Sequence, residues 1–362
     1  MSSSAPKFFR IYLRVALAVG LLLTLSWVVP AYSQDQSLPP GQLDELLTRV
    51  RESAPGGVTP LNAVAVGQRL LSRQRYREAE ELFDALLEKL PSDPAVLYGG
   101  ALAKFNLNKA AAAEPLARSC IEILAKKETS SAVKSVQWEQ RRRGADALVL
   151  LAIILGSRGA DTEALTTVKR AAALMPEHFD AQFTLGRALF GVGETAAAAM
   201  AFRAALKVKP NDAKTLFFLA TALENSGDPA AALKAYQELV IVEPQAAEGY
   251  LGLGVLLLKG GRDTEKGIQE LKIALSINPD LYEARVNLGR ALLLRNRAEE
   301  SLPHLRRAAE LAPTNPEPHY QLALAYRRLR MNDKAAEETE TVRRIHEARR
   351  GTAIQSTRAT TP

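Results

Sequence analysis

The stretch LKVKPND at residues 206–212 has three close counterparts, which are VIVEPQA at 240–246, LSINPDL at 275–281 and ELAPTNP at 310–316. Each ends an apolar run with a proline and polar residues. Their prolines, together with Pro176, follow one another at steps of 34, 34, 35 and 34 residues. A nearly constant period in this range indicates stacked structural repeats, in which each unit packs on its neighbours.

Each repeat unit reads as two helices joined by a turn. In the unit 213–246, LFFLATAL at 216–223 spaces its apolar residues three and four apart, which is typical of one face of an amphipathic helix. NSGD at 225–228 follows as a turn, and Pro229 suits the first turn of a second helix. The chain is therefore expected to be all-α.

Three positions of the unit have characteristic side-chain sizes. Counted from the start of each unit, position 8 holds glycine or alanine and position 20 holds alanine in most units, as in Gly186 and Ala198. Position 24 is large in most units: Phe83, Val168, Phe202, Tyr236 and Leu305. Small residues let helices approach closely, so the large residue is expected to pack at tight helix crossings.

These offsets resemble those of the tetratricopeptide repeat family. LGRALF at 185–190, LGLGVLLL at 251–258 and LGRALLL at 288–294 carry the leucine-glycine pair of that family. The resemblance covers residues 60–347, in about eight units that start near residues 60, 94, 145, 179, 213, 247, 282 and 316. It implies an all-α, right-handed superhelical solenoid whose inner groove is lined by the first helix of each helix-turn-helix unit.

The segments outside the regular units are expected to have separate roles. The surplus residues 126–144 should extend two helices and lengthen their connection. Residues 34–59 read as a linker with a short capping helix at 42–52, and the highly charged helix after Asn332 reads as a terminal cap. Residues 348–362 are expected to form a disordered tail.

Residues 1–33 have the order of charged, apolar and small residues found in secretory signal peptides. Three basic residues precede a nearly unbroken apolar run at 15–29, and Ala31 and Ser33 follow at cleavage-site spacing. Cleavage near Ser33 would make the protein periplasmic or secreted. The apolar run is short against the about 20 residues of a membrane-spanning helix. Its retention as an anchor, with the repeats outside the cytoplasm, stays open as the alternative.

Composition and motifs narrow the possible function classes. The net charge is +7 and both signs are interspersed through the repeats, so no nucleic-acid partner is expected. The single cysteine, Cys120, reads as a small buried residue, and the four histidines lie at different repeat positions. Because the sequence contains no metal-binding, catalytic or phosphate-binding motif, we expect no enzyme activity, no metal and no cofactor.

The surface of the first helices is the candidate binding site. Positions 5, 9 and 12 lie off the core stripe and, by the resemblance, face the groove. In four successive units they are Phe183, Arg187 and Phe190; Phe217, Thr221 and Glu224; Leu251, Val255 and Leu258; and Val286, Arg290 and Leu293. Two readings of these largely apolar positions stay open: neighbouring helices cover them, or a segment of a partner protein does.

The second reading predicts an exported scaffold for protein–protein interaction. It would bind an extended or helical peptide, with Arg187, Glu224 and Arg290 selecting its charges. Position 5 holds no lysine in these units, so the carboxylate clamp of some family members is not expected. The alternative function is a structural subunit of an envelope assembly anchored by residues 15–29. The basic stretch 141–143 also offers a contact for anionic lipid or polymer.

Overall fold

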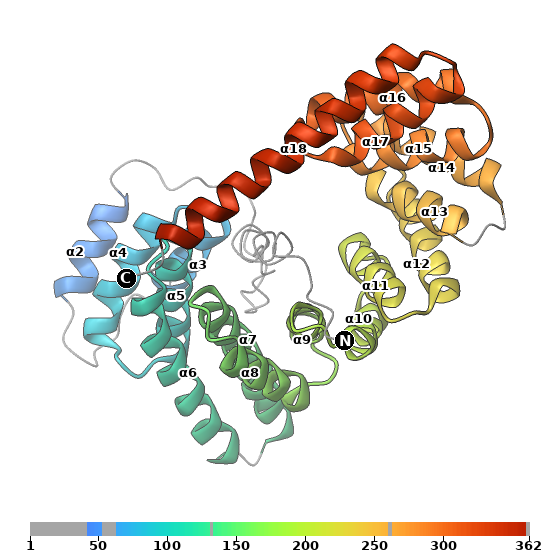
Figure 1. Ribbon diagram of the computed structural model, residues 1–362. Helices are drawn as coiled ribbons and strands as arrows, with labels where there is room; N and C mark the ends of the chain where they lie inside the picture. Colours follow the sequence, from blue (N-terminus) through green and yellow to red (C-terminus); the bar gives the residue numbers. More distant parts are fainter. Residues whose placement is uncertain (1–41, 53–62, 131–132, 260–262, 360–362) are drawn as a thin grey trace. The chain divides into compact units, whose positions relative to one another are not determined.

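The computed structural model describes residues 42–52, 63–130, 133–259 and 263–359 of the 362-residue chain. These residues form helices and no strand (Figure 1). The helices are α2 (Gln42–Glu52), α3 (Ala63–Ser72), α4 (Tyr76–Lys89), α5 (Pro94–Asn106), α6 (Ala110–Ser130), α7 (Lys134–Ser157), α8 (Asp161–Leu174), α9 (Phe179–Gly191), α10 (Thr195–Val208), α11 (Ala213–Asn225), α12 (Pro229–Val242), α13 (Ala247–Lys259), α14 (Thr264–Ile277), α15 (Tyr282–Leu294), α16 (Ala298–Leu311), α17 (Pro316–Arg328) and α18 (Asn332–Ala359). The all-α repeat solenoid expected from the sequence is therefore confirmed.

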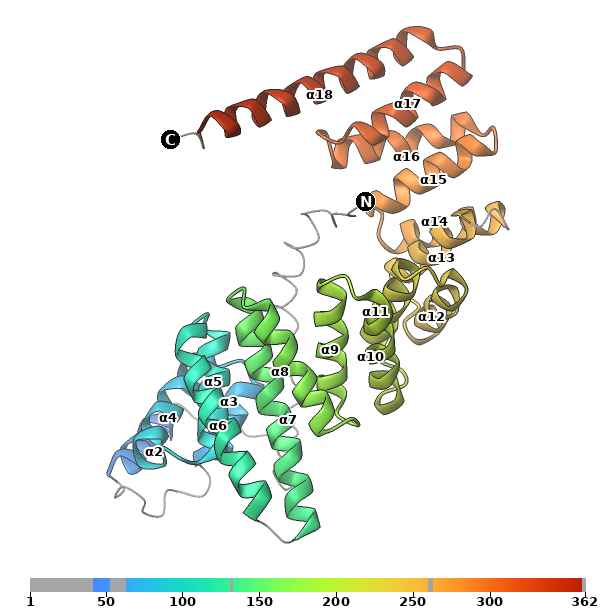
Figure 2. The ribbon, with the colours of Figure 1, turned by 60° about the horizontal axis from the view of Figure 1, so that its bottom comes forward.

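The chain divides into two compact units, one ending at Pro210 and one starting at Asn211. In each unit, consecutive helices pair as hairpins, from α3–α4 to α9–α10 in the first unit and from α11–α12 to α17–α18 in the second (Figures 1 and 2). Each second helix also packs on the first helix of the next pair in its unit, and α2 packs on α4. The core of each unit therefore grows along the stack.

The large residue at position 24 packs between two first helices. Phe83 is fully buried, and a Cβ atom added at Gly67 or Gly99 would lie only 2.6 Å or 2.2 Å from its Cζ atom. In the second unit, a Cβ atom added at Gly252 would lie 2.4 Å from Cζ of Tyr236. These glycines let a ring occupy the space that a side chain would need, as the size pattern predicted.

The turns between paired helices share one backbone conformation. Gly159, Gly193 and Gly227 have φ of 79°, 84° and 84°, in the left-handed region that glycine tolerates. The same repeat position has positive φ at Gln74, Asn108, Asn296 and Arg330. Asparagine tolerates this conformation, so helix packing imposes it chiefly on Gln74 and Arg330.

Helices α6, α7 and α18 are longer than the others. The surplus residues lie in the last turns of α6 and the first turns of α7, which are 21 and 24 residues long. Helix α18 runs to Ala359, so it includes residues 348–359, for which the sequence led us to expect a disordered tail. Gly351 is the only glycine of α18 and the next proline is Pro362, so no strong helix breaker interrupts it.

The N-terminal predictions fall outside the part of the chain that the structure describes. The proposed signal peptide at 1–33 and most of the linker at 34–59 belong to this group, while the expected capping helix at 42–52 is α2. Among the described residues, no helix combines the length and the hydrophobicity needed to cross a membrane.

Candidate functional site

In the first unit, the predicted groove residues lie on α9. Phe183 is half-buried, with its ring centroid 5.9 Å from those of Phe179 and Phe202. The guanidinium carbon of Arg187 lies 5.9 Å from the Phe183 ring centroid, and burial lowers the pKa of the Arg187 guanidinium. Phe190 is buried and belongs to the core. Phe183 and Arg187 therefore form the surface-accessible part of this group.

In the second unit, three predicted residues lie half-buried on α11. The Thr221 hydroxyl donates to the carbonyl oxygen of Phe217 at 2.9 Å and lies 3.4 Å from the hydroxyl of Tyr236. Glu224 Oε1 accepts a hydrogen bond of 2.6 Å from Nζ of Lys259, at the end of α13. The fold thus already supplies a cation to Glu224, which reduces the charge that Glu224 offers to a partner.

The predicted residues of α13 and α15 differ in their exposure. Leu251 and Leu258 are half-buried and pack against the core formed by α14 and α15, and Val255 is also half-buried. On α15, Val286 and Leu293 are buried, with exposed fractions of 6% and 2%, whereas Arg290 is exposed.

Coverage by neighbouring helices is therefore the correct reading for Phe190, Val286 and Leu293. These three predicted site residues are core residues instead. Of the other nine, Arg290 is exposed and eight are half-buried, and two of those eight, Phe183 and Arg187, lie in the first unit. In the second unit, Tyr320 and Leu324 of α17 also occupy positions 5 and 9 and are exposed.

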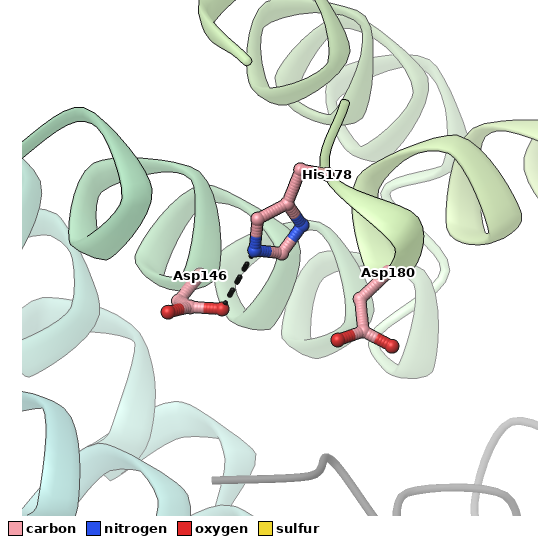
Figure 3. Close-up of side chains that lie close together, drawn as sticks. All are labelled: Asp146, His178 and Asp180. Carbon is pink, nitrogen blue, oxygen red and sulfur yellow. Dashed lines mark hydrogen bonds and ion pairs between the residues drawn. The ribbon is translucent and has the colours of Figure 1, made fainter. Parts of the chain in front are cut away.

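A cluster of polar side chains in the first unit was not predicted from the sequence. His178 Nε2 lies 3.0 Å from Asp146 Oδ1, and Asp180 lies on the other side of the imidazole ring (Figure 3). The candidate ligand atoms of the three residues all lie within 4.8 Å of one another. Burial, followed by the charges of Asp146 and Asp180, raises the pKa of the buried Tyr98 hydroxyl well above its ordinary value.

The hydrogen bonds of His178 argue against a metal ion at this cluster. The backbone N–H of Ala181 donates to His178 Nδ1 at 3.2 Å, so Nδ1 carries no proton and Nε2 donates to Asp146. A metal ion on Nε2 would require the ring proton on Nδ1, facing the Ala181 N–H donor. His178 therefore caps α9 and links it to α7 through Asp146.

Solved structures that are similar to this chain include a protein described as containing TPR repeats. The C-terminal part of a TPR repeat-containing protein from Cytophaga hutchinsonii is 16% identical, with a TM-score of 0.56, and the match covers 72% of this chain and 99% of that chain. PilF of Pseudomonas aeruginosa is 17% identical, with a TM-score of 0.50 and coverage of 57% and 94%. A fragment of MamA from Desulfovibrio magneticus is 23% identical, with a TM-score of 0.44 and coverage of 47% and 96%.

Sequence comparison identifies the family. No curated protein matches the chain. A family model described as tetratricopeptide repeat matches residues 65–126, 162–213, 183–240, 217–281 and 262–316, which together make up more than half of the 362 residues. The glycine-lined crossings at Phe83 and Tyr236 lie within these matches. The chain therefore belongs to the tetratricopeptide repeat family.

Proposed function

We propose that this protein is an exported scaffold that binds an extended or helical segment of a partner protein along its first helices. Tetratricopeptide repeat proteins bind other proteins or peptides, and the chain belongs to that family. The observation that carries the proposal is the accessibility of position 5. Phe183 and Phe217 keep a minor part of their surface accessible there, and Tyr320 is 49% exposed.

Accessible aromatic side chains at a repeated position suit partner recognition. Aromatic residues dominate the energetics of protein interfaces because they bury a large area with few rotatable bonds. Arg290 is exposed on α15 and would select an acidic residue of the partner. Glu224 would contribute less to charge selection, since Lys259 already binds it.

Site-specific photo-crosslinking tests the proposal. A photo-reactive phenylalanine analogue at Phe217 should yield adducts with a partner protein in the native host. The same analogue at Ile241, which is 77% exposed on α12, is the matched control. Adducts at position 217 and not at 241 would support binding along the first helices. Equal yields at the two positions, or adducts at neither, would refute it.

Export is the second part of the proposal. It is supported by the sequence of residues 1–33, in which basic, apolar and small residues follow in the order of a signal peptide. N-terminal sequencing of the protein purified from its host should find Gln34 as the first residue. An intact N-terminus in the membrane fraction would instead favour the alternative function, a structural subunit of an anchored envelope assembly.

A further inference from the structure

Helices α6 and α7 carry a second surface, separate from the proposed peptide site. They are 21 and 24 residues long, whereas the neighbouring α5 and α8 have 13 and 14 residues. Together α6 and α7 form a long antiparallel hairpin. At 1.5 Å per residue, their seven or more extra residues make each of them roughly 10 Å longer than α5 and α8. Figure 2 shows the end of this hairpin extending past α8. We define the hairpin tip as residues 126–129 of α6 with residues 133–143 of α7 and its N-cap.

Apolar side chains are exposed at the hairpin tip. Val133, Val136 and Trp138 are 56%, 42% and 51% exposed. Single exposed apolar residues are ordinary, but here three lie within six residues at a projecting end. At 100° per residue, Val136 and Trp138 lie on opposite sides of α7. This arrangement suits a tip that enters a surface end-on and does not suit a helix that lies flat on it.

The hairpin tip is also strongly basic. It contains six lysines and arginines and two glutamates, for a net charge of +4. The two glutamates bind arginines, with Arg141 2.7 Å from Glu128 and Arg143 2.8 Å from Glu139. Lys134 is exposed, and the guanidinium carbon of Arg142 lies 5.7 Å from the Trp138 ring centroid.

We propose that the hairpin tip binds an anionic lipid surface. Tryptophan prefers the headgroup region of a bilayer, where its ring is buried and its N–H stays hydrated, and lysine and arginine are attracted to anionic headgroups. Apolar side chains that enter the headgroup region add to this attraction. The three lysines of the tip favour lipid over a protein partner, because lysine is depleted at protein interfaces, where tryptophan and arginine are enriched.

The fluorescence of Trp138 provides a local test in the full chain. The sequence contains two tryptophans, Trp27 and Trp138, so Trp27→Phe leaves Trp138 as the only reporter. We expect vesicles of phosphatidylcholine mixed with phosphatidylglycerol to shift its emission to shorter wavelength, and brominated lipid to quench it. Vesicles of phosphatidylcholine alone should have little effect, and added salt should reverse the shift.

Two charge-reversed variants of this Trp27→Phe chain separate the tip from the rest of the protein. Lys134→Glu with Arg142→Glu should weaken the vesicle response by about tenfold or more, because each cation near an anionic surface contributes to binding. Lys169→Glu with Arg170→Glu makes the same change in net charge at exposed positions of α8 and should leave the response unchanged. Circular dichroism checks that both variants are folded.

Three results would overturn the proposal. They are no change in Trp138 emission with anionic vesicles, an equal change with neutral vesicles, or an equal loss in both variants. Residues 15–29 are present in every variant, so vesicle binding through them alone would appear as cosedimentation without a Trp138 response. That outcome would also count against the hairpin tip as a lipid contact.

Discussion

The packing of Phe83 against two glycines leads to a prediction that can be tested in detail. The ring of Phe83 is fully buried and fills the space beside Gly67 and Gly99. A methyl group at Gly99 would lie 2.2 Å to 2.7 Å from three ring carbons, which is closer than real Cβ contacts allow. Gly99→Ala should therefore displace the ring of Phe83.

The magnitude of each change follows from core-packing energetics. Phe83→Ala removes a fully buried ring and should cost about 3–5 kcal/mol of unfolding free energy. Gly99→Ala overpacks the crossing, at about 1–3 kcal/mol, but alanine also gains about 1 kcal/mol of helix propensity over glycine. The net cost should be about 0–2 kcal/mol. Phe83→Leu shortens the side chain, so Gly99→Ala should cost less in that background, with a coupling energy of about 1 kcal/mol.

Urea unfolding followed by circular dichroism would measure the double-mutant cycle. Because repeat arrays unfold in parts, hydrogen exchange in α4 and α5 should accompany it. We expect faster exchange in both helices for Gly99→Ala, with partial recovery when Phe83→Leu is added. Additive effects, or a Gly99→Ala variant more stable than the parent, would show that the ring and the glycine do not share this space.

Three further predictions concern other parts of the fold. His178→Ala removes the cap of α9 and leaves the buried Asp146 without its hydrogen-bond donor. Thermal or urea unfolding should therefore show a loss of about 2–3 kcal/mol of unfolding free energy. A loss below about 0.5 kcal/mol would contradict this role. Burial raises the pKa of the Cys120 thiol to about 12. Thiol reagents near pH 8 should therefore modify Cys120 only when the protein unfolds. Rapid modification of the native protein would contradict its burial. Arg330 has a positive φ of 57°, which is strained for a residue with a side chain. Arg330→Gly should therefore raise the unfolding free energy in urea by about 0.5–1 kcal/mol. An unchanged unfolding free energy would mean that the turn is not strained.

The repeat register could be predicted from the sequence because it depends on local signals. The periodic prolines placed unit starts near 213, 247, 282 and 316, and α11, α13, α15 and α17 begin at these residues. Proline, turn residues and apolar spacing all act within one unit of 34 residues. They therefore agree without knowledge of how neighbouring units pack.

The accessibility of the groove residues could not be predicted in the same way. Positions 5, 9 and 12 were assigned from the core stripe of a single helix and from the family resemblance, which treat Phe183 and Val286 alike. In the structure Phe183 is half-buried and Val286 is buried, because exposure depends on the helices that pack beside each position. Similarly, Lys259 lies 35 residues after Glu224, so their ion pair follows from stacking and not from local sequence.

The polar cluster was missed for a related reason, although a signal was present. Asp146 and Asp180 both occupy position 2 of their units, and His178 occupies the last position of the unit that contains Asp146. Stacking places these positions at the same end of adjacent first helices. A comparison of polar residues across units, in addition to apolar residues within a unit, would have indicated that the three side chains meet.

The side chains that fill each helix crossing come from two successive repeats, which limits how the repeats can be reordered. Within each compact unit, an aromatic residue at position 24 is followed by glycine at position 6 of the next repeat, as in Phe83 with Gly99 and Tyr236 with Gly252. Where position 24 is Ala117, position 6 of the next repeat is the fully buried Leu150. A dense core keeps the summed volume at each crossing nearly constant, so a ring placed against leucine would overpack and an alanine placed against glycine would leave a cavity. Each repeat therefore fits its own successor, and the order of the repeats is part of what stabilises the stack.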